Sequence, residues 1–231
     1  MPKTILSFAS RFIGAVFEAV VILAGGSAPP AWLAGELPAR VFVIAADSGL
    51  ENARRLGLDV NLLVGDLDSV TAATLADYPD IPVERHPPDK DQTDLDLALE
   101  AASGVEANQV IVVGGSGGRI DHLLANAALL TSHRFAALEL SWLTAEGRAH
   151  VVRSVLVIHG SSGDLVSLIP YGGTVVGVST AGLRWPLQDD TLPSGTTRGV
   201  SNEMTGPVAR VNVTEGVLLA IHLPSDLGAG L

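Results

Sequence analysis

Residues 61–69 read Asn-Leu-Leu-Val-Gly-Asp-Leu-Asp-Ser, an apolar run that stops at a glycine and two aspartates. The run 61–64 is short and continuous, which is typical of a strand that is buried on both faces. Asp66 and Asp68 follow it two positions apart, so in an extended chain their carboxylates point to the same side. Because ligands bind outside the carboxyl ends of the strands in open α/β sheets, this stretch predicts a functional site there.

The same pattern recurs through the first 145 residues. Four further short apolar runs read as buried strands, at 20–24, 41–46, 110–113 and 138–143. Apolar residues at helical spacing lie between the runs, over 49–56, 94–102 and 121–130. Strands that alternate with helices predict βαβ units and an open parallel α/β sheet.

The second half of the chain has a different pattern. Strand-like runs follow one another with little helical signal, at 155–159, 164–169, 174–179, 208–213 and 217–223. Turns rich in Gly, Pro and Asn separate them, which predicts a small antiparallel β-sandwich. We therefore expect an N-terminal extension at 1–19, an α/β domain at 20–147 and an all-β domain at 148–231.

Composition excludes several classes of function. The chain has 231 residues, no Cys and a formal net charge of −11, so a nucleic-acid partner, disulfides and a thiolate zinc site are not expected. Residues 59–96 hold ten acidic and two basic residues, so most of the negative charge is local. Neither of the two lysines, Lys3 and Lys90, lies in a Walker-type phosphate loop. No membrane segment is evident, and we expect a cytoplasmic protein.

Acidic residues gather where the strands are predicted to end. Asp66 and Asp68 suit Mg²⁺, which takes hard oxygen ligands, although Asp and Ser are also ordinary turn residues. Residues 89–96 carry four further aspartates, beside Lys90. Thr93 can cap the helix that follows, and Asp94 would lie in its first turn, where the helix dipole stabilises an anion.

The glycine-rich run at 114–118 allows two interpretations. Its backbone N–H groups could approach a phosphate, with Arg119 adding a planar cationic donor. The run also matches Gly-x-Ser-x-Gly, so Ser116 could be the nucleophile of a serine hydrolase, completed by Asp164 and His222. The hydrolase interpretation leaves the acidic cluster without a role.

Taken together, the motifs resemble the thiamine pyrophosphokinase family. The motifs occur in the family's order, and the resemblance spans about residues 20–223. The matching stretches are Asp47-Ser48-Gly49, Gly65-Asp66-Leu67-Asp68-Ser69, Lys90-Asp91-Gln92-Thr93-Asp94, Gly117-Gly118-Arg119-Ile120-Asp121-His122, Gly182-Leu183-Arg184-Trp185-Pro186-Leu187 and Ser201-Asn202. The family's architecture, an α/β nucleotide-binding domain followed by a β-sandwich, is the one read from the patterns above.

The resemblance implies a diphosphoryl transfer from ATP to the hydroxyl of thiamine, with AMP as the second product. It implies Mg²⁺ on Asp66, Asp68 and Asp94, and a homodimer whose thiamine pockets combine both subunits. The catalytic residues would be Asp66, Asp68, Lys90, Asp91, Asp94, Arg119 and Asp121. ATP would contact Asp47, Gly117, Gly118 and Arg119, and thiamine would contact Trp185, Ser201 and Asn202.

Some points stay open at the level of sequence. Leu67 stands where the family usually has Phe, and Ser48 where it usually has Gly. Any of Asp91, Asp94 and Asp121 could accept the proton of the thiamine hydroxyl. A related pyrimidine alcohol could be the substrate, and a non-catalytic nucleotide- or thiamine-binding protein is a further alternative.

Overall fold

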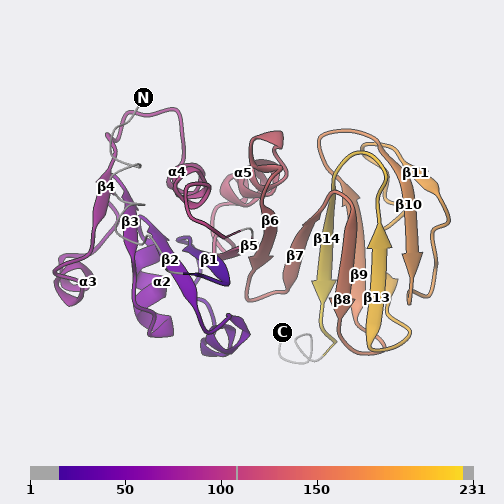
Figure 1. Cartoon of the computed structure of the whole chain (residues 1–231), viewed down its shortest axis with the longest axis horizontal. Helices are drawn as coiled ribbons and strands as arrows, with labels where there is room; N and C mark the ends of the chain where they lie inside the picture. Colours follow the sequence, from indigo (N-terminus) through magenta and orange to yellow (C-terminus); the bar gives the residue numbers. More distant parts are fainter. Residues whose placement is uncertain (1–15, 108, 226–231) are drawn as a thin grey trace. The chain divides into compact units, whose positions relative to one another are not determined.

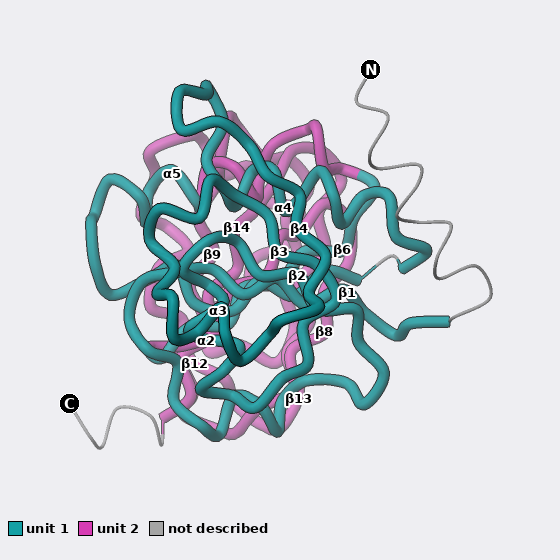
Figure 2. The backbone as a smooth tube through the Cα atoms, turned by 90° about the vertical axis from the view of Figure 1, so that its left-hand side faces the viewer, with its two compact units in different colours: residues 1–126, 137–145 teal, residues 127–136, 146–231 magenta. Residues whose placement is uncertain are grey.

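The structure is a computed structural model and describes residues 16–107 and 109–225, in two compact units. The first unit comprises residues up to 126 together with 137–145, and the second comprises 127–136 and the residues from 146 onward (Figure 2). Residues 1–15 of the expected N-terminal extension lie outside the described part. Within the described residues, no helix has the length and apolar character needed to cross a membrane.

The first unit is built on a parallel sheet. Its strand order is β6-β5-β1-β2-β3-β4, and each neighbouring pair in that order is parallel (Figure 1). The strands are β1 (Ala19–Leu23), β2 (Val41–Ala46), β3 (Leu62–Gly65), β4 (Val83–Arg85), β5 (Gln109–Val113) and β6 (Glu139–Leu143). The central strand β1 is buried along its whole length, as its continuous apolar run predicts.

Helices α2 (Gly49–Leu56) and α4 (Asp94–Ala102) pack against the strands of this sheet. The first unit also holds α3 (Ala72–Asp77), the 3₁₀ turn η2 (Ala31–Glu36) and the start of α5 (Ile120–Leu130), whereas the rest of α5 and the 3₁₀ turn η3 (His133–Phe135) belong to the second unit. The predicted cap of α4 is confirmed, because the Thr93 hydroxyl accepts the backbone N–H of Asp96 at 3.2 Å. α2 is followed by Gly57, whose φ of 67° is the left-handed conformation that favours glycine just after a helix.

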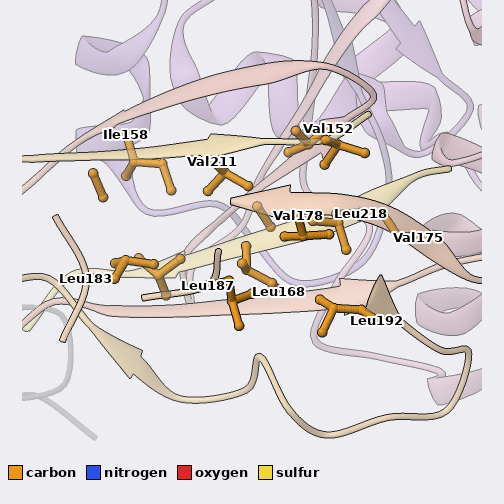
Figure 3. Packing of buried hydrophobic residues seen from close by; sticks show 14 of the residues in the cluster. Val152, Ile158, Leu168, Val175, Val178, Leu183, Leu187, Leu192, Val211 and Leu218 are labelled. Carbon is orange, nitrogen blue, oxygen red and sulfur yellow. The ribbon is translucent and has the colours of Figure 1, made fainter. Parts of the chain in front are cut away.

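The second unit contains antiparallel strands in two sheets, in the orders β12-β9-β14-β7 and β11-β10-β13-β8. Their bounds are Arg148–Val152 (β7), Val155–His159 (β8), Leu165–Pro170 (β9), Val175–Ala181 (β10), Asp190–Leu192 (β11), Asn202–Glu203 (β12), Val208–Asn212 (β13) and Leu218–Leu223 (β14). Alternate residues of both sheets form one apolar core, which includes Leu168, Val178 and Leu218 (Figure 3). The predicted fold class, α/β followed by all-β, is confirmed.

Two polar side chains are buried at the end of β14. His222 Nε2 lies 2.8 Å from Asp164 Oδ2, and the two side chains are 2% and 4% exposed. Asp164 also accepts the backbone N–H groups of Ser161 and Ser225, each at 2.9 Å. Burial opposes ionisation, but these backbone donors and His222 together lower the pKa of Asp164 to about 2. The carboxylate therefore ties the turn before β9 to the chain after β14.

Asp164→Asn should lower the free energy of unfolding by about 2 kcal/mol at pH 7, as measured by denaturant titration. The pKa of Asp164 is lower in the folded protein than in the unfolded chain, so its stabilisation is complete above about pH 4. This stabilisation is lost as the pH falls through about 2. The difference between variant and parent should therefore shrink across that window. Glu215→Gln, an exposed change in the same unit, serves as the control, and an equal loss there would contradict the assignment.

Candidate active site

A cavity of about 680 Å³ opens at the carboxyl ends of the strands of the first unit. The loops after β1, β2, β3 and β5 all contribute to it, as the sequence predicts. Of the predicted residues, those that line the cavity are Asp47, Asp66, Asp68, Lys90, Asp94, Gly118 and Arg119. Gly117 and Asp91 in the same loops and Asp121 in the first turn of α5 are exposed and are not among its lining residues.

Three carboxylates converge in this cavity. Asp47, Asp66 and Asp68 each offer an oxygen, and these oxygens lie within 4.8 Å of one another. Asp47 is 6% exposed, and its Oδ1 is buried without a hydrogen-bond partner. Burial, and then the charges of Asp94 and Asp66, raise the pKa of Asp47 above its usual range. A buried carboxylate oxygen that lacks a donor, beside two further hard oxygen ligands, fits a divalent cation such as Mg²⁺.

Lys90 bridges two of the predicted metal ligands. Its Nζ lies 2.8 Å from Asp94 Oδ1 and 3.4 Å from Asp66 Oδ2. Although burial acts in the opposite direction, Asp94 and then Asp66 hold the pKa of Lys90 above its usual value. The structure thus gives Asp94 an ammonium partner and places Asp47, expected on the nucleotide side, among the carboxylates that can hold a cation.

Gly65 allows these groups to meet. It ends β3 with a φ of 145°, and a Cβ there would lie 3.1 Å from both Asp47 Cβ and Asp94 Oδ1. Those contacts are tighter than side chains normally allow. A residue with a side chain would therefore push apart the two loops that carry Asp47 and Asp94.

The glycine run after β5 rests on the loop after β1. The N–H of Gly115 donates to the Gly25 carbonyl at 2.7 Å, and the N–H of Ser27 donates to the Ser116 carbonyl at 2.9 Å. The Ser27 hydroxyl donates to the Gly117 carbonyl at 2.5 Å. These bonds fix the run at the start of α5, beside the cavity.

Arg119 and Asp121 form an exposed ion pair at the start of α5. Arg119 Nε lies 3.1 Å from Asp121 Oδ1, and a guanidinium nitrogen contacts the other carboxylate oxygen. The Arg119 guanidinium holds the pKa of Asp121 below its usual value. Exposed pairs contribute little to stability, so an incoming phosphate could displace Asp121 from Arg119 at low cost.

The hydrolase interpretation loses its support in the second unit. Asp164 and His222 do pair, but both are buried, and Asp164 is also held by two backbone N–H groups. These contacts give Asp164 and His222 a structural role, which is to hold the turn before β9 against the chain after β14. Ser116 is itself buried, at 8% exposure.

The residues matched to thiamine lie in the second unit. Trp185 is 55% exposed, and the Arg184 guanidinium lies 5.0 Å from the centroid of its ring. The buried Asn202 amide nitrogen donates to the Trp185 backbone carbonyl at 2.7 Å, and the Asn202 amide oxygen accepts the backbone N–H of Trp185 at 3.1 Å. Ser201 has a φ of 59°, and its N–H donates to the Ser167 hydroxyl at 3.0 Å. Asn202 therefore fixes the backbone that carries the exposed indole.

Three further lining residues were not predicted as site residues from the sequence: Ser69, Gln92 and Asn126. Gln92 lies within the Lys90–Asp94 stretch, so its place in the site could have been predicted from the acidic residues beside it. Asn126 is one helical turn beyond His122 on α5, and it donates to the Gly115 carbonyl at 3.1 Å. Its position on the cavity side of a helix could be inferred only from that spacing.

Both parts of the chain match models of one protein family. The family model "Thiamin pyrophosphokinase, catalytic domain" matches residues 36–141, and "Thiamin pyrophosphokinase, vitamin B1 binding domain" matches residues 154–218. The two matches together cover more than half of the chain. The chain belongs to the thiamine pyrophosphokinase family. The protein is therefore an enzyme of the thiamine pyrophosphokinase type.

Relatives of this thiamine pyrophosphokinase family member come from bacteria and plants. A thiamine pyrophosphokinase of Bacillus subtilis (strain 168) is 24% identical over 194 residues, which are 82% of this chain and 91% of the relative. Thiamine pyrophosphokinase 1 of Oryza sativa subsp. japonica is 25% identical over 188 residues, 73% of this chain and 68% of the relative.

Solved thiamine pyrophosphokinase structures share the fold. The Bacillus subtilis structure superposes with a TM-score of 0.80 at 25% identity and covers 90% of this chain and 99% of its own. The Candida albicans structure gives a TM-score of 0.72 at 12% identity, with 94% and 91% covered. At that identity the likeness shows the fold alone.

Asp47→Asn should raise the thermal midpoint of the metal-free protein by a few degrees, measured by calorimetry in EDTA at pH 7. The pKa of Asp47 is raised in the folded state, so its ionised form destabilises that state, and the neutral amide removes the cost. The advantage should vanish as the pH falls and Asp47 itself becomes protonated. Added Mg²⁺ should stabilise the parent but not the variant.

Asp189→Asn is the matched control for this measurement. Asp189 is also an aspartate with positive φ, at 55°, but it is exposed and lies in the second unit. Its substitution should leave the midpoint nearly unchanged. An Asp47→Asn protein no more stable than its parent in EDTA would show that the buried carboxylate carries no such cost.

Proposed function

We propose that the protein transfers the diphosphoryl group of ATP to the hydroxyl of thiamine, giving thiamine diphosphate and AMP, with Mg²⁺ as cofactor. The observation that carries the proposal is the convergence of Asp47, Asp66 and Asp68, with an unpartnered buried oxygen on Asp47, in a member of this family. Bound Mg²⁺ would neutralise phosphate charge and orient the transferred group.

The chain's own residues divide the remaining work. Lys90 and Arg119 supply cationic donors for phosphate oxygens, and the glycine run with Gly117 and Gly118 lets backbone approach them. The hydroxyl oxygen of thiamine forms the bond to the β-phosphorus, the bond between the α- and β-phosphates breaks, and AMP leaves. A carboxylate takes the hydroxyl proton. Asp94 is the candidate that lines the cavity, while Asp91 and Asp121 remain alternatives from the neighbouring loops.

Asp94 retains a place in the proposed metal site. It faces Asp66 across Lys90, and its charge contributes to the raised pKa of Asp47. Release of the Lys90 ammonium toward a phosphate would leave Asp94 free to join Asp66 and Asp68 as a ligand.

Thiamine is proposed to bind through the second domain. The thiazolium ring is cationic, and the exposed indole of Trp185 offers a face for it. Ser201 lies beside the fixed Asn202 amide and presents an exposed side chain. We assign the α/β catalytic domain to 20–147 and the thiamine-binding and dimerisation domain to 148–231. We further propose a cytoplasmic homodimer whose thiamine pockets combine both subunits.

Incubation with ATP, Mg²⁺ and thiamine should release AMP and form thiamine diphosphate in equal amounts, measured by chromatography. Asp66→Asn and Asp68→Asn should each reduce kcat about 100-fold or more without unfolding the protein. Asp80→Asn, an exposed change outside the cavity, is the control and should retain the parent rate.

Three outcomes would contradict this function. Release of ADP would mean transfer of a single phosphoryl group, and binding without turnover would favour a sensor. Faster turnover of a hydroxymethyl-pyrimidine alcohol than of thiamine would show that the pyrimidine alcohol is the preferred substrate.

Trp185→Ala should raise KM for thiamine about tenfold and change KM for ATP less than twofold, since stacking on a cation is worth about 0.5–2 kcal/mol. Trp185→Phe should recover part of the loss because it keeps an aromatic face. Trp32→Ala removes another partly exposed indole, from η2 in the first unit, and should leave both KM values unchanged. Equal effects of Trp185→Ala on the two substrates would remove Trp185 from the thiamine site.

A further inference from the structure

Leu67, between the two aspartates of the Gly65–Ser69 stretch, has an unusual backbone conformation. Its φ is 69°, in the left-handed region that large apolar residues rarely enter. Among the described residues, the other non-glycine positions with positive φ are Asp47, Asp189 and Ser201. Those three have short polar side chains, which tolerate the left-handed region better than Leu does. Strain that persists at such a residue requires surroundings that impose it.

This conformation shapes the pair of carboxylates. The chain turns at Leu67, and the backbone N–H of Asp68 donates to Asp66 Oδ1 at 3.1 Å. That bond is the largest contribution to the lowered pKa of Asp66. The turn sets Asp66 and Asp68 so that an oxygen of each lies within 4.8 Å of an Asp47 oxygen. A relaxed backbone at residue 67 would spread the two carboxylates.

The side chain of Leu67 supplies the anchor that holds the turn. It packs against an apolar cluster whose buried members come from β2, α2, β3 and the loop before α3. These buried members are Ala45, Leu50, Leu63 and Val70, joined at the edge by Val60, Leu75, Tyr78 and Ile81. Arg85 Nη1 also donates to the Asp66 carbonyl of the turn at 3.4 Å. Leu67 thereby couples an apolar core to the geometry of the acidic cluster.

We propose that Leu67 is a positioning residue for the divalent cation, whose packing into this cluster fixes the turn that brings Asp66 and Asp68 to Asp47. The inference rests on the proposed metal-dependent function. It predicts that loss of the apolar anchor weakens the cation site, although Leu67 offers no ligand atom. Replacement of a residue that orients the metal ligands without binding the metal typically weakens metal affinity by about 10–100-fold.

The test measures the dissociation constant of Mn²⁺ by electron paramagnetic resonance on the full chain, so that no turnover is needed. Leu67→Ala should weaken Mn²⁺ binding about tenfold. Leu67→Met, which keeps a long apolar side chain, should stay within about twofold of the parent. Leu75→Ala is the matched control, since it removes the same atoms from the same cluster without touching the turn. It should lower the thermal midpoint about as much as Leu67→Ala does and leave Mn²⁺ binding unchanged.

Leu67→Asn separates the anchor from the backbone preference and serves as a second variant if Leu67→Ala does not fold. Asn tolerates positive φ but has no apolar side chain, so it should also weaken Mn²⁺ binding about tenfold. Mn²⁺ affinity at the parent level in Leu67→Asn or Leu67→Ala would overturn the inference, as would an equal loss in Leu75→Ala. A parent that binds no Mn²⁺ would refute the metal site and this inference together. Metal binding without AMP release would refute only the proposed reaction.

Discussion

Repulsion among carboxylates at one end of the parallel sheet is the constraint around which the first unit is arranged. Two unit charges 4.8 Å apart repel each other by about 3 kcal/mol at an effective dielectric constant of about 20. Asp47, Asp66 and Asp68 hold such spacings because the carboxyl ends of β2 and β3 lie side by side. Gly65 removes the side chain that would keep the loops apart. Burial is the main cause of the raised pKa of Asp47, and the charges of Asp94 and Asp66 add to it.

The ionisable side chains that line the cavity carry more negative than positive charge. Four aspartates face Lys90 and Arg119, so the lining carries a net charge of −2 when all six groups are ionised. Lys90 is shared by Asp66 and Asp94, and Arg119 is paired with Asp121 outside the lining. The deficit therefore concentrates on the side of Asp47. One divalent cation would cancel it, and phosphate groups would then compete with carboxylates for Lys90 and Arg119.

Sequence patterns identified the parts of this design that depend on burial. Strands such as β1 are covered on both faces, so their continuous apolar runs mark them and their ends. β4 and α3 gave no such signal, because β4 has three residues with no fully buried side chain and α3 buries only Thr74. The role of Asp47 beside Asp66 was equally hidden. An isolated aspartate after a strand is typical of a turn, and its partners lie 19 and 21 positions further along the chain.

Matching residues to a motif identifies the site more reliably than it identifies what each residue does. Asn202 occupies a position expected to contact thiamine, yet its amide is engaged with the backbone of Trp185 on both sides. Leu67 separates two expected ligands and offers no polar atom, yet its backbone sets their spacing. In both cases the side chain fixes a neighbour whose polar or aromatic group we propose as the ligand contact. Backbone geometry therefore limits which residues these two positions accept. A substitution at Leu67 should be judged by whether it keeps the turn, and one at Asn202 by whether it keeps the hydrogen bonds to the Trp185 backbone.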